Sequence, residues 1–174
     1  MKKLSLLLLD ANIVIILHEL GIWDKVIEQC DIYLSGTVID LEAKYWEDKN
    51  EIRHTIDLTN CLSKGVIKRF DLDSSEIEGF RQKYGAMYIE KLDPGEAESL
   101  AFLFREQEKY IICSSDGIVY RLLGAEFASD RGLSLEEILI RIGLQRSLPH
   151  QFTKEFRERY SDQGFKEGFQ GTAF

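Results

Sequence analysis

The stretch LSLLLL, residues 4–9, constrains the fold more than any other feature, because it is apolar almost throughout and ends at Asp10. A continuous apolar run of this length is typical of a strand in a parallel sheet that helices cover on both faces. A buried carboxylate without a partner costs several kcal/mol or takes up a proton. We therefore expect a partner or a cation at Asp10, or an exit of the chain from the core there.

The lysines at positions 2 and 3, followed by leucines, imitate a secretory signal. The apolar run stops at Asp10, however, with no small-residue cleavage site after it, and it is too short to span a bilayer. We expect a soluble, cytoplasmic protein with no membrane partner. Cys30, Cys61 and Cys113 are far apart in the chain, which favours buried thiols over a disulfide framework or a zinc site.

Apolar strands alternate with helix-like segments, and this pattern predicts an α/β fold, a three-layer α/β/α sandwich with a central parallel sheet. Strands are expected at residues 4–9, 31–35, 65–73 and 109–113, with a weak one at 125–129. Helices are expected at about 12–20, 23–30, 38–46, 75–85, 94–104, 117–124 and 135–144. Val38, Leu41 and Tyr45 would share one face of their helix, and residues 47–64 would form an exposed helix or arm.

The length predicts one domain, residues 1–146, followed by a C-terminal appendage, residues 147–174. In the appendage, Phe152, Phe156 and Tyr160 recur every four residues, as along one face of a helix. Such a face must be covered. Either the protein's own body covers it, or it docks on a second subunit of a homodimer or on an antitoxin-like protein.

Acidic side chains follow the predicted strands or begin the next helices. Asp10 and Asp116 each come after a strongly apolar strand, and the carboxyl ends of parallel strands meet at one edge of a sheet. Glu42 and Glu96 lie near the starts of two helices, so four carboxylates can meet there. Oxygen ligands of this type suit Mg²⁺ or Mn²⁺, which can activate water for attack on a phosphodiester. Asn12 either adds a neutral oxygen or caps the first helix.

Four segments, LLLLDANIVI, SGTVIDLEAKYW, LDPGEAESLAFLF and IICSSDGIVYRLLG, resemble in order and spacing the signature segments of the PIN domain, a family of metal-dependent ribonucleases. The resemblance covers residues 4 to about 145. It implies the sheet order 3-2-1-4-5 and the hydrolysis of single-stranded RNA. It also implies a set of site residues: Asp10, Glu42, Glu96 and Asp116 as catalytic acids, Asp10, Glu96 and Asp116 as metal ligands, and Asn12 and Ser114 in support.

Two of these assignments have competitors nearby in the sequence. Glu98 flanks the same apolar helix stripe as Glu96, and Asp93 with Glu96 also matches a capping box. Asp40 competes in the same way with Glu42. Periodicity alone does not choose between the members of either pair.

The leading expectation is a divalent-metal-dependent endoribonuclease, which in bacteria is frequently the toxin of a toxin–antitoxin pair. One alternative is a non-catalytic binding or scaffold module, which the net charge of -8 favours because an acidic surface repels RNA. Another is a haloacid-dehalogenase-like phosphatase, although that family needs a second aspartate where this chain has Asn12. A basic rim for RNA would consist of Lys44, Lys49, Arg53, Lys64, Lys68 and Arg69.

Overall fold

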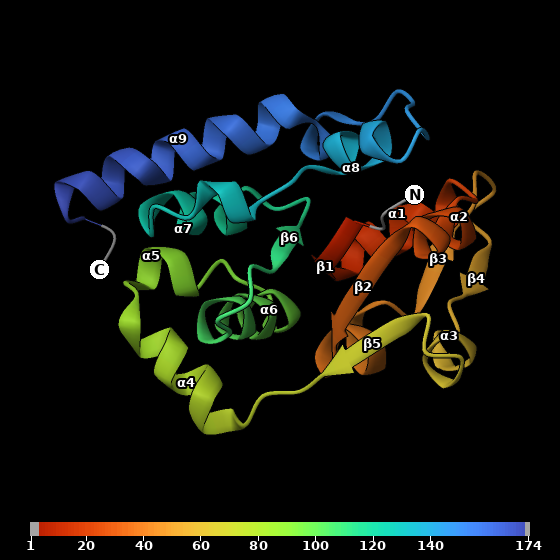
Figure 1. Ribbon diagram of the computed structural model, residues 1–174, viewed down its shortest axis with the longest axis horizontal. Coiled ribbons are helices and arrows are strands. Elements are labelled where there is room, and N and C mark those ends of the chain that lie inside the picture. The colour runs from red at the N-terminus through yellow and green to blue at the C-terminus, as the bar shows by residue number, and fades with distance from the viewer. Residues whose placement is uncertain (1–3, 173–174) are drawn as a thin grey trace.

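The computed structural model describes residues 4–172 and contains a four-stranded parallel sheet in the order β5-β2-β1-β6 (Figure 1). The strands are β1 (Leu4–Leu9), β2 (Cys30–Ser35), β5 (Ile67–Phe70) and β6 (Ile111–Cys113). Leu7 and Leu9 pack into one hydrophobic cluster, whereas Leu8 packs into a second. Side chains alternate across a strand, so the two clusters lie on opposite faces of the sheet. The predicted α/β fold with helices on both faces is therefore confirmed.

Each face of the sheet has its own helices. The cluster with Leu7 includes side chains of α1 (Ala11–Glu19), α2 (Trp23–Gln29) and α8 (Leu135–Arg141). The cluster with Leu8 includes side chains of α4 (Ser74–Lys83), α5 (Ala86–Ile89), α6 (Pro94–Arg105) and α7 (Gly117–Ala125). Two short 3-10 turns are η2 (Ser129–Arg131) and η3 (His150–Phe152). No helix within residues 4–172 combines the length and the apolarity needed to cross a membrane.

The predicted sheet order 3-2-1-4-5 is wrong, because the parallel sheet has no fifth strand within the described residues. Counted along the chain, the four strands stand in the order 3-2-1-4. The segment expected to be the fifth strand instead completes α7 and turns at Phe127, whose φ of 56° is incompatible with an extended strand. One parallel bridge between Ile112 and Gly132 marks where the chain passes β6.

The segment after Thr37 also differs from its prediction. It forms a single π-helical turn, η1 (Val38–Glu42), and then becomes extended. Leu41 and Tyr45 are therefore exposed instead of sharing a buried face with Val38. The early end of this turn places Glu42 at its last residue.

The charged segment at 47–64 contains a β-hairpin and a short helix rather than one continuous helix. The hairpin pairs β3 (Tyr45–Glu47) with β4 (Arg53–Thr55), and α3 (Thr59–Ser63) follows. Asp48 closes the turn by accepting hydrogen bonds from the N–H groups of Asn50 and Ile52. Trp46 stacks on His54 across the two strands, which is the kind of cross-strand pair that stabilises a hairpin.

The C-terminal helix α9 (Lys154–Gln170) folds back along α7 (Figure 1). Phe156 and Tyr160 pack against the cluster on the Leu8 face. The two helix backbones approach closely, since a Cβ atom added at Gly164 would lie 1.7 Å from the carbonyl oxygen of Arg121. Phe152, expected on the same helix face, instead ends η3 and packs into the cluster with Leu7. The protein's own body thus covers Phe156 and Tyr160, which was one of the two expected alternatives. The division of the chain at residue 146 stays a prediction.

Candidate functional site

Asp10 and Asp116 lie at the same edge of the sheet: Asp10 directly follows β1, and Asp116 comes three residues after the end of the neighbouring parallel strand β6. Each one caps the following helix. Asp10 accepts a hydrogen bond from the N–H of Ile13 at 2.9 Å, and Asp116 accepts one from the N–H of Ile118 at 3.0 Å. Aspartate is a favoured residue for this role. The chain leaves the core at Asp10, but this side chain stays buried, with 2% of its surface exposed.

Ser114, directly after β6, connects Asp10 to Glu96. Its buried hydroxyl lies 2.5 Å from Asp10 Oδ2 and 3.1 Å from Glu96 Oε1, and it accepts a hydrogen bond from the N–H of Asp116 at 2.9 Å. A hydroxyl has only one proton to donate. All these contacts are satisfied when Ser114 donates to Asp10 and a protonated Glu96 donates to Ser114.

Burial raises the pKa of both carboxyl groups, Asp10 and Glu96, and a raised pKa favours the protonated form that this network requires. Loss of hydration raises the pKa of Asp10 to about 6, although hydrogen bonds from Ser114, Ile13 and Ser115 oppose the shift. Burial also raises the pKa of Glu96 to about 8, and the negative charges of Asp10 and Asp116 add to the effect. The cluster therefore holds a proton at neutral pH.

Glu42 approaches the same place from the end of η1. Its Oε1 accepts a hydrogen bond from the N–H of Gly95 at 2.9 Å. A Cβ atom at position 95 would lie 2.2 Å from Glu42 Oε2, so only glycine lets this carboxylate reach the start of α6. Burial raises the pKa of Glu42, the bond from Gly95 opposes the shift, and the charges of Asp93 and Glu98 add to it.

A cavity of about 340 Å³ opens between these elements. Four carboxylates line it, those of Asp10, Glu42, Asp93 and Glu96, and no Lys, Arg or His of the described chain is among its lining residues. From the sequence, Asp93 was predicted only to cap a helix. Its place before Pro94 at the start of that helix was the available signal that it lies near Glu96. Asn12 also lines this cavity and is exposed. It does not cap α1, because Asp10 does.

The structure distinguishes two predicted site residues, Glu96 and Glu42, from their neighbours Glu98 and Asp40. Glu98 points elsewhere: its carboxylate accepts hydrogen bonds from the N–H groups of Thr37 and Leu72, at 3.2 and 3.1 Å. Asp40 forms a bidentate ion pair with Arg69 on the surface, with distances of 3.1 and 2.8 Å. Glu96 and Glu42 are thus the members of each pair that line the cavity.

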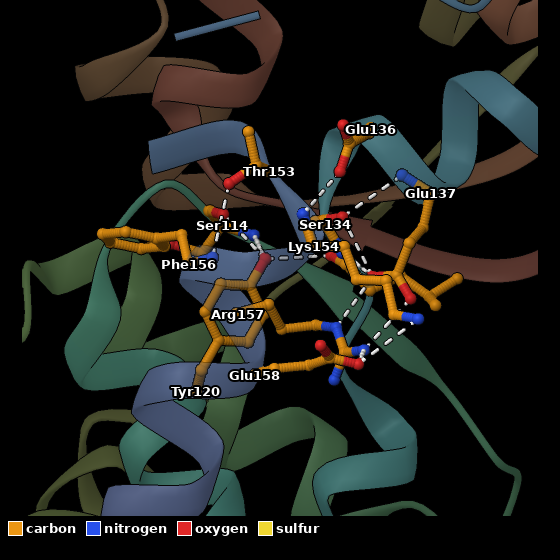
Figure 2. A network of polar contacts seen from close by, with 11 residues as sticks. Ser114, Tyr120, Ser134, Glu136, Glu137, Thr153, Lys154, Phe156, Arg157 and Glu158 are labelled. Atoms are coloured by element: carbon orange, nitrogen blue, oxygen red, sulfur yellow. Dashed lines mark hydrogen bonds and ion pairs between the residues drawn. The ribbon is translucent and has the colours of Figure 1, made fainter. Parts of the chain in front are cut away.

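Tyr120 supports Ser114 from behind, and the sequence analysis did not single it out. Its buried hydroxyl donates to the carbonyl oxygen of Ser114 at 2.7 Å and accepts from the N–H of Ser114 at 3.1 Å (Figure 2). This contact joins the end of a strand to the first turns of the following helix. Neither a strand period nor a helix period marks such a contact in the sequence.

Several members of the expected basic rim have local partners. Arg53 donates to Glu47 at 2.8 Å, Lys68 donates to the hydroxyl of Tyr33 at 2.9 Å, and Arg69 pairs with two aspartates. The remaining three members are exposed: Lys44, Lys49 and Lys64. The predicted rim is therefore not a uniform cationic surface.

The residues present fit a divalent cation in charge and in ligand type. Within residues 4–172, however, no three His, Cys, Asp or Glu side chains form a ready-made metal-binding group. Asp10 accepts three hydrogen bonds and Glu96 is contacted by two partners, whereas a carboxylate offers about four acceptor positions. Hard oxygen atoms thus remain available at the cavity, and these are the donors that Mg²⁺ and Mn²⁺ prefer.

Comparison with known proteins finds no match to this chain among family models, curated proteins or solved structures. The resemblance to the PIN domain therefore rests on the four sequence segments and their order. The chemistry of the acidic cavity has to be inferred from its own residues.

Proposed function

We propose that this chain is a PIN-like endoribonuclease that cleaves single-stranded RNA with Mg²⁺ or Mn²⁺ in the acidic cavity. One observation carries the proposal: the negative charge of the cavity is not compensated. Four carboxylates line it without a basic side chain among the lining residues, and Asp116 adds negative potential at both Asp10 and Glu96. Asp10 and Glu96 are the two buried members, and two buried like charges side by side are stable only if one is protonated or if they bind a cation.

In this proposal Asp10 and Glu96, which line the cavity with Glu42, hold the cation together with Asp116, which does not line the cavity but acts electrostatically on both of them. When bound, the cation supplies charge stabilisation for the scissile phosphodiester and lowers the pKa of a bound water. Ser114 fixes the orientation of Asp10 and Glu96 through its hydroxyl. The raised pKa of Glu42 suits it to accept the proton of the attacking water.

The test is cleavage of end-labelled single-stranded RNA over a titration of Mg²⁺ or Mn²⁺. We expect cleavage that depends on the cation, stops on addition of a chelator and is lost in Glu96→Gln. Glu98→Gln is the matched control, because it neutralises a buried glutamate two residues away that does not line the cavity. Absence of cleavage with either cation, over a panel of single-stranded sequences, would contradict the proposal.

A second candidate is a non-catalytic module that binds a cation or a partner through the same cavity. The observation in its favour is that the three proposed ligands already have structural roles: Asp10 and Asp116 cap α1 and α7, and Glu96 completes the capping box of α6 with Asp93. Binding of Mn²⁺ without any RNA cleavage would select this alternative.

The toxin role is a further part of the proposal and has its own test. Induced expression of the wild-type chain in a bacterial host should arrest growth, whereas Asp10→Asn should not. Equal growth of both cultures, at equal protein levels, would argue against a toxin.

A further inference from the structure

A second depression adjoins the acidic cavity and shares two of its walls. It has a volume of about 340 Å³ and is lined by Ile15, Glu19, Glu42, Tyr45, Trp46 and Glu47. Ile15 and Glu42 also line the acidic cavity. A chain held over the carboxylates can therefore continue directly onto the β3–β4 hairpin.

The hairpin presents an aromatic ring at this second depression. Tyr45 is 43% exposed, and the guanidinium carbon of Arg53 lies 4.4 Å from the centre of its ring. The ring next to it is fixed, since Trp46 stacks on His54 and His54 is held by Asp48 at 3.0 Å. Arg53 thus holds the ring of Tyr45 from one side, and the Trp46–His54 stack holds the hairpin, before any ligand binds, which lowers the entropic cost of binding.

The hairpin is also less repulsive to a polyanion than the chain as a whole. Residues 44–55 contain three basic residues (Lys44, Lys49, Arg53) and three acidic residues (Glu47, Asp48, Glu51), so their net charge is zero, against -8 for the full chain. Arg53 donates to Glu47 through Nε. A guanidinium has five N–H donors, so its terminal nitrogens can still donate to a phosphate.

We propose that the β3–β4 hairpin is a stacking platform for one RNA base next to the scissile phosphodiester. Tyr45 stacks on the base, and Arg53 steadies the ring and contacts the adjoining phosphate. This inference rests on the proposed nuclease function and adds a nucleotide subsite to it. Because every base has an aromatic face, the subsite favours single-stranded over paired RNA without a strict sequence preference.

The test measures KM and kcat for a short single-stranded RNA that carries 2-aminopurine beside the cleaved bond. Stacking on a side chain is worth about 10-fold or more in affinity. We expect Tyr45→Ala to raise KM about 10-fold, to leave kcat within about twofold and to abolish the quenching of 2-aminopurine. Tyr45→Trp should restore both. Tyr45→Leu, which keeps apolar bulk without a ring, should behave like Tyr45→Ala.

Phe169→Ala is the control, because Phe169 is an 80% exposed aromatic residue of α9. The C-terminal end of α9 and the β3–β4 hairpin lie at opposite ends of the molecule (Figure 1). If the wild type cleaves RNA but Tyr45→Ala and Tyr45→Leu leave KM unchanged, the platform is refuted and the nuclease proposal stands. A loss confined to kcat also refutes the platform. If the wild type neither cleaves nor quenches, both proposals fall.

Discussion

Buried acidic side chains at two places in this protein have opposite surroundings, because one place has a basic partner side chain and the other lacks one among the described residues. At the acidic cavity, Asp10 and Glu96 are buried beside each other and share a serine hydroxyl. At the contact of α9 with α8, Glu137 is also largely shielded, but Arg157 donates to it twice, at 2.7 and 3.0 Å (Figure 2). Within residues 4–172, the fold thus provides a cationic side chain for Glu137 and none for Asp10 and Glu96.

The pKa shifts follow from this difference. Burial acts to raise the pKa of Glu137, but hydrogen bonds from Arg157 and Ser134 outweigh it and lower the pKa. Burial raises the pKa of Asp10 and Glu96, and no arginine of the described part of the chain offsets it. The lesson is that burial alone does not distinguish a structural acid from a site acid. An acid whose partner cation is missing from the fold is the better candidate for a ligand site.

The largest expected effect is on RNA cleavage. Asp116→Asn removes one proposed ligand and should reduce kcat/KM by about 1,000-fold, or about 4 kcal/mol, which is the scale of charge stabilisation by a catalytic metal. Asp40→Asn is the control, since that carboxylate lies on the surface with Arg69, and it should stay within about twofold. Equal activity of the two variants would remove the basis for the proposed site.

The second effect is on stability and concerns the ion pair of Glu137 with Arg157. Arg157→Met leaves Glu137 without its cation and should lower the free energy of unfolding by about 3 kcal/mol, the usual cost of breaking a buried pair. The measurement is urea denaturation at neutral pH.

Lys154→Met provides the comparison for Arg157→Met, because Lys154 pairs with Glu158 at an exposed position of the same helix. It should cost less than about 0.5 kcal/mol. If Arg157→Met costs no more than this control, then α9 is not held by its buried ion pair.

The third effect is a pH dependence of the free energy of unfolding that comes from Glu96. Glu96 has an ordinary pKa of 4.5 and a pKa of about 8 in the folded protein, so between these values the folded state keeps a proton that the unfolded state has lost. The metal-free free energy of unfolding should therefore fall as the pH rises from about 4.5 towards 8, by on the order of 2 kcal/mol. Denaturation in a chelator over this pH range measures it, and a rise in stability would contradict the assignment.

The smallest effect is expected for Glu96→Gln, and Glu137→Gln should change the stability in the opposite direction. Glu96→Gln should stabilise the metal-free protein at pH 8 by about 1 kcal/mol, because it removes a buried like charge. Glu137→Gln should destabilise it, because it removes the partner of Arg157. Melting temperatures in a chelator report both, and shifts of the same sign would break the contrast between the two groups.

Sequence reasoning placed Asp10 and Asp116 correctly because strand ends follow from local apolar runs. Periodicity did not choose between Glu96 and Glu98, since both flank one helix stripe, and only the resemblance to the PIN domain favoured Glu96. Their difference lies in distant partners, Ser114 for one and the backbone of Thr37 for the other. Such contacts join segments that no local period relates.

The errors in the fold have similar causes. The strand expected at 125–129 was a weak pattern, and the left-handed conformation of Phe127 ended it. The helix expected after Thr37 ends at Glu42, whose carboxylate accepts a hydrogen bond from the distant N–H of Gly95, and the chain then becomes extended. The ion pair of Arg157 with Glu137 could not be read either, because it depends on how α9 docks.

The central claim is that the acidic cavity binds a divalent cation, and calorimetric titration of the full chain with Mn²⁺ at pH 7.5 tests it directly. We expect one binding site, and binding of the cation there should release a proton. The proton release is measured as a difference in the heat of binding between buffers of different ionisation enthalpy. Binding should be lost in Glu96→Gln and kept in Glu98→Gln. Absence of binding by the wild type, or equal binding by both variants, would contradict the account.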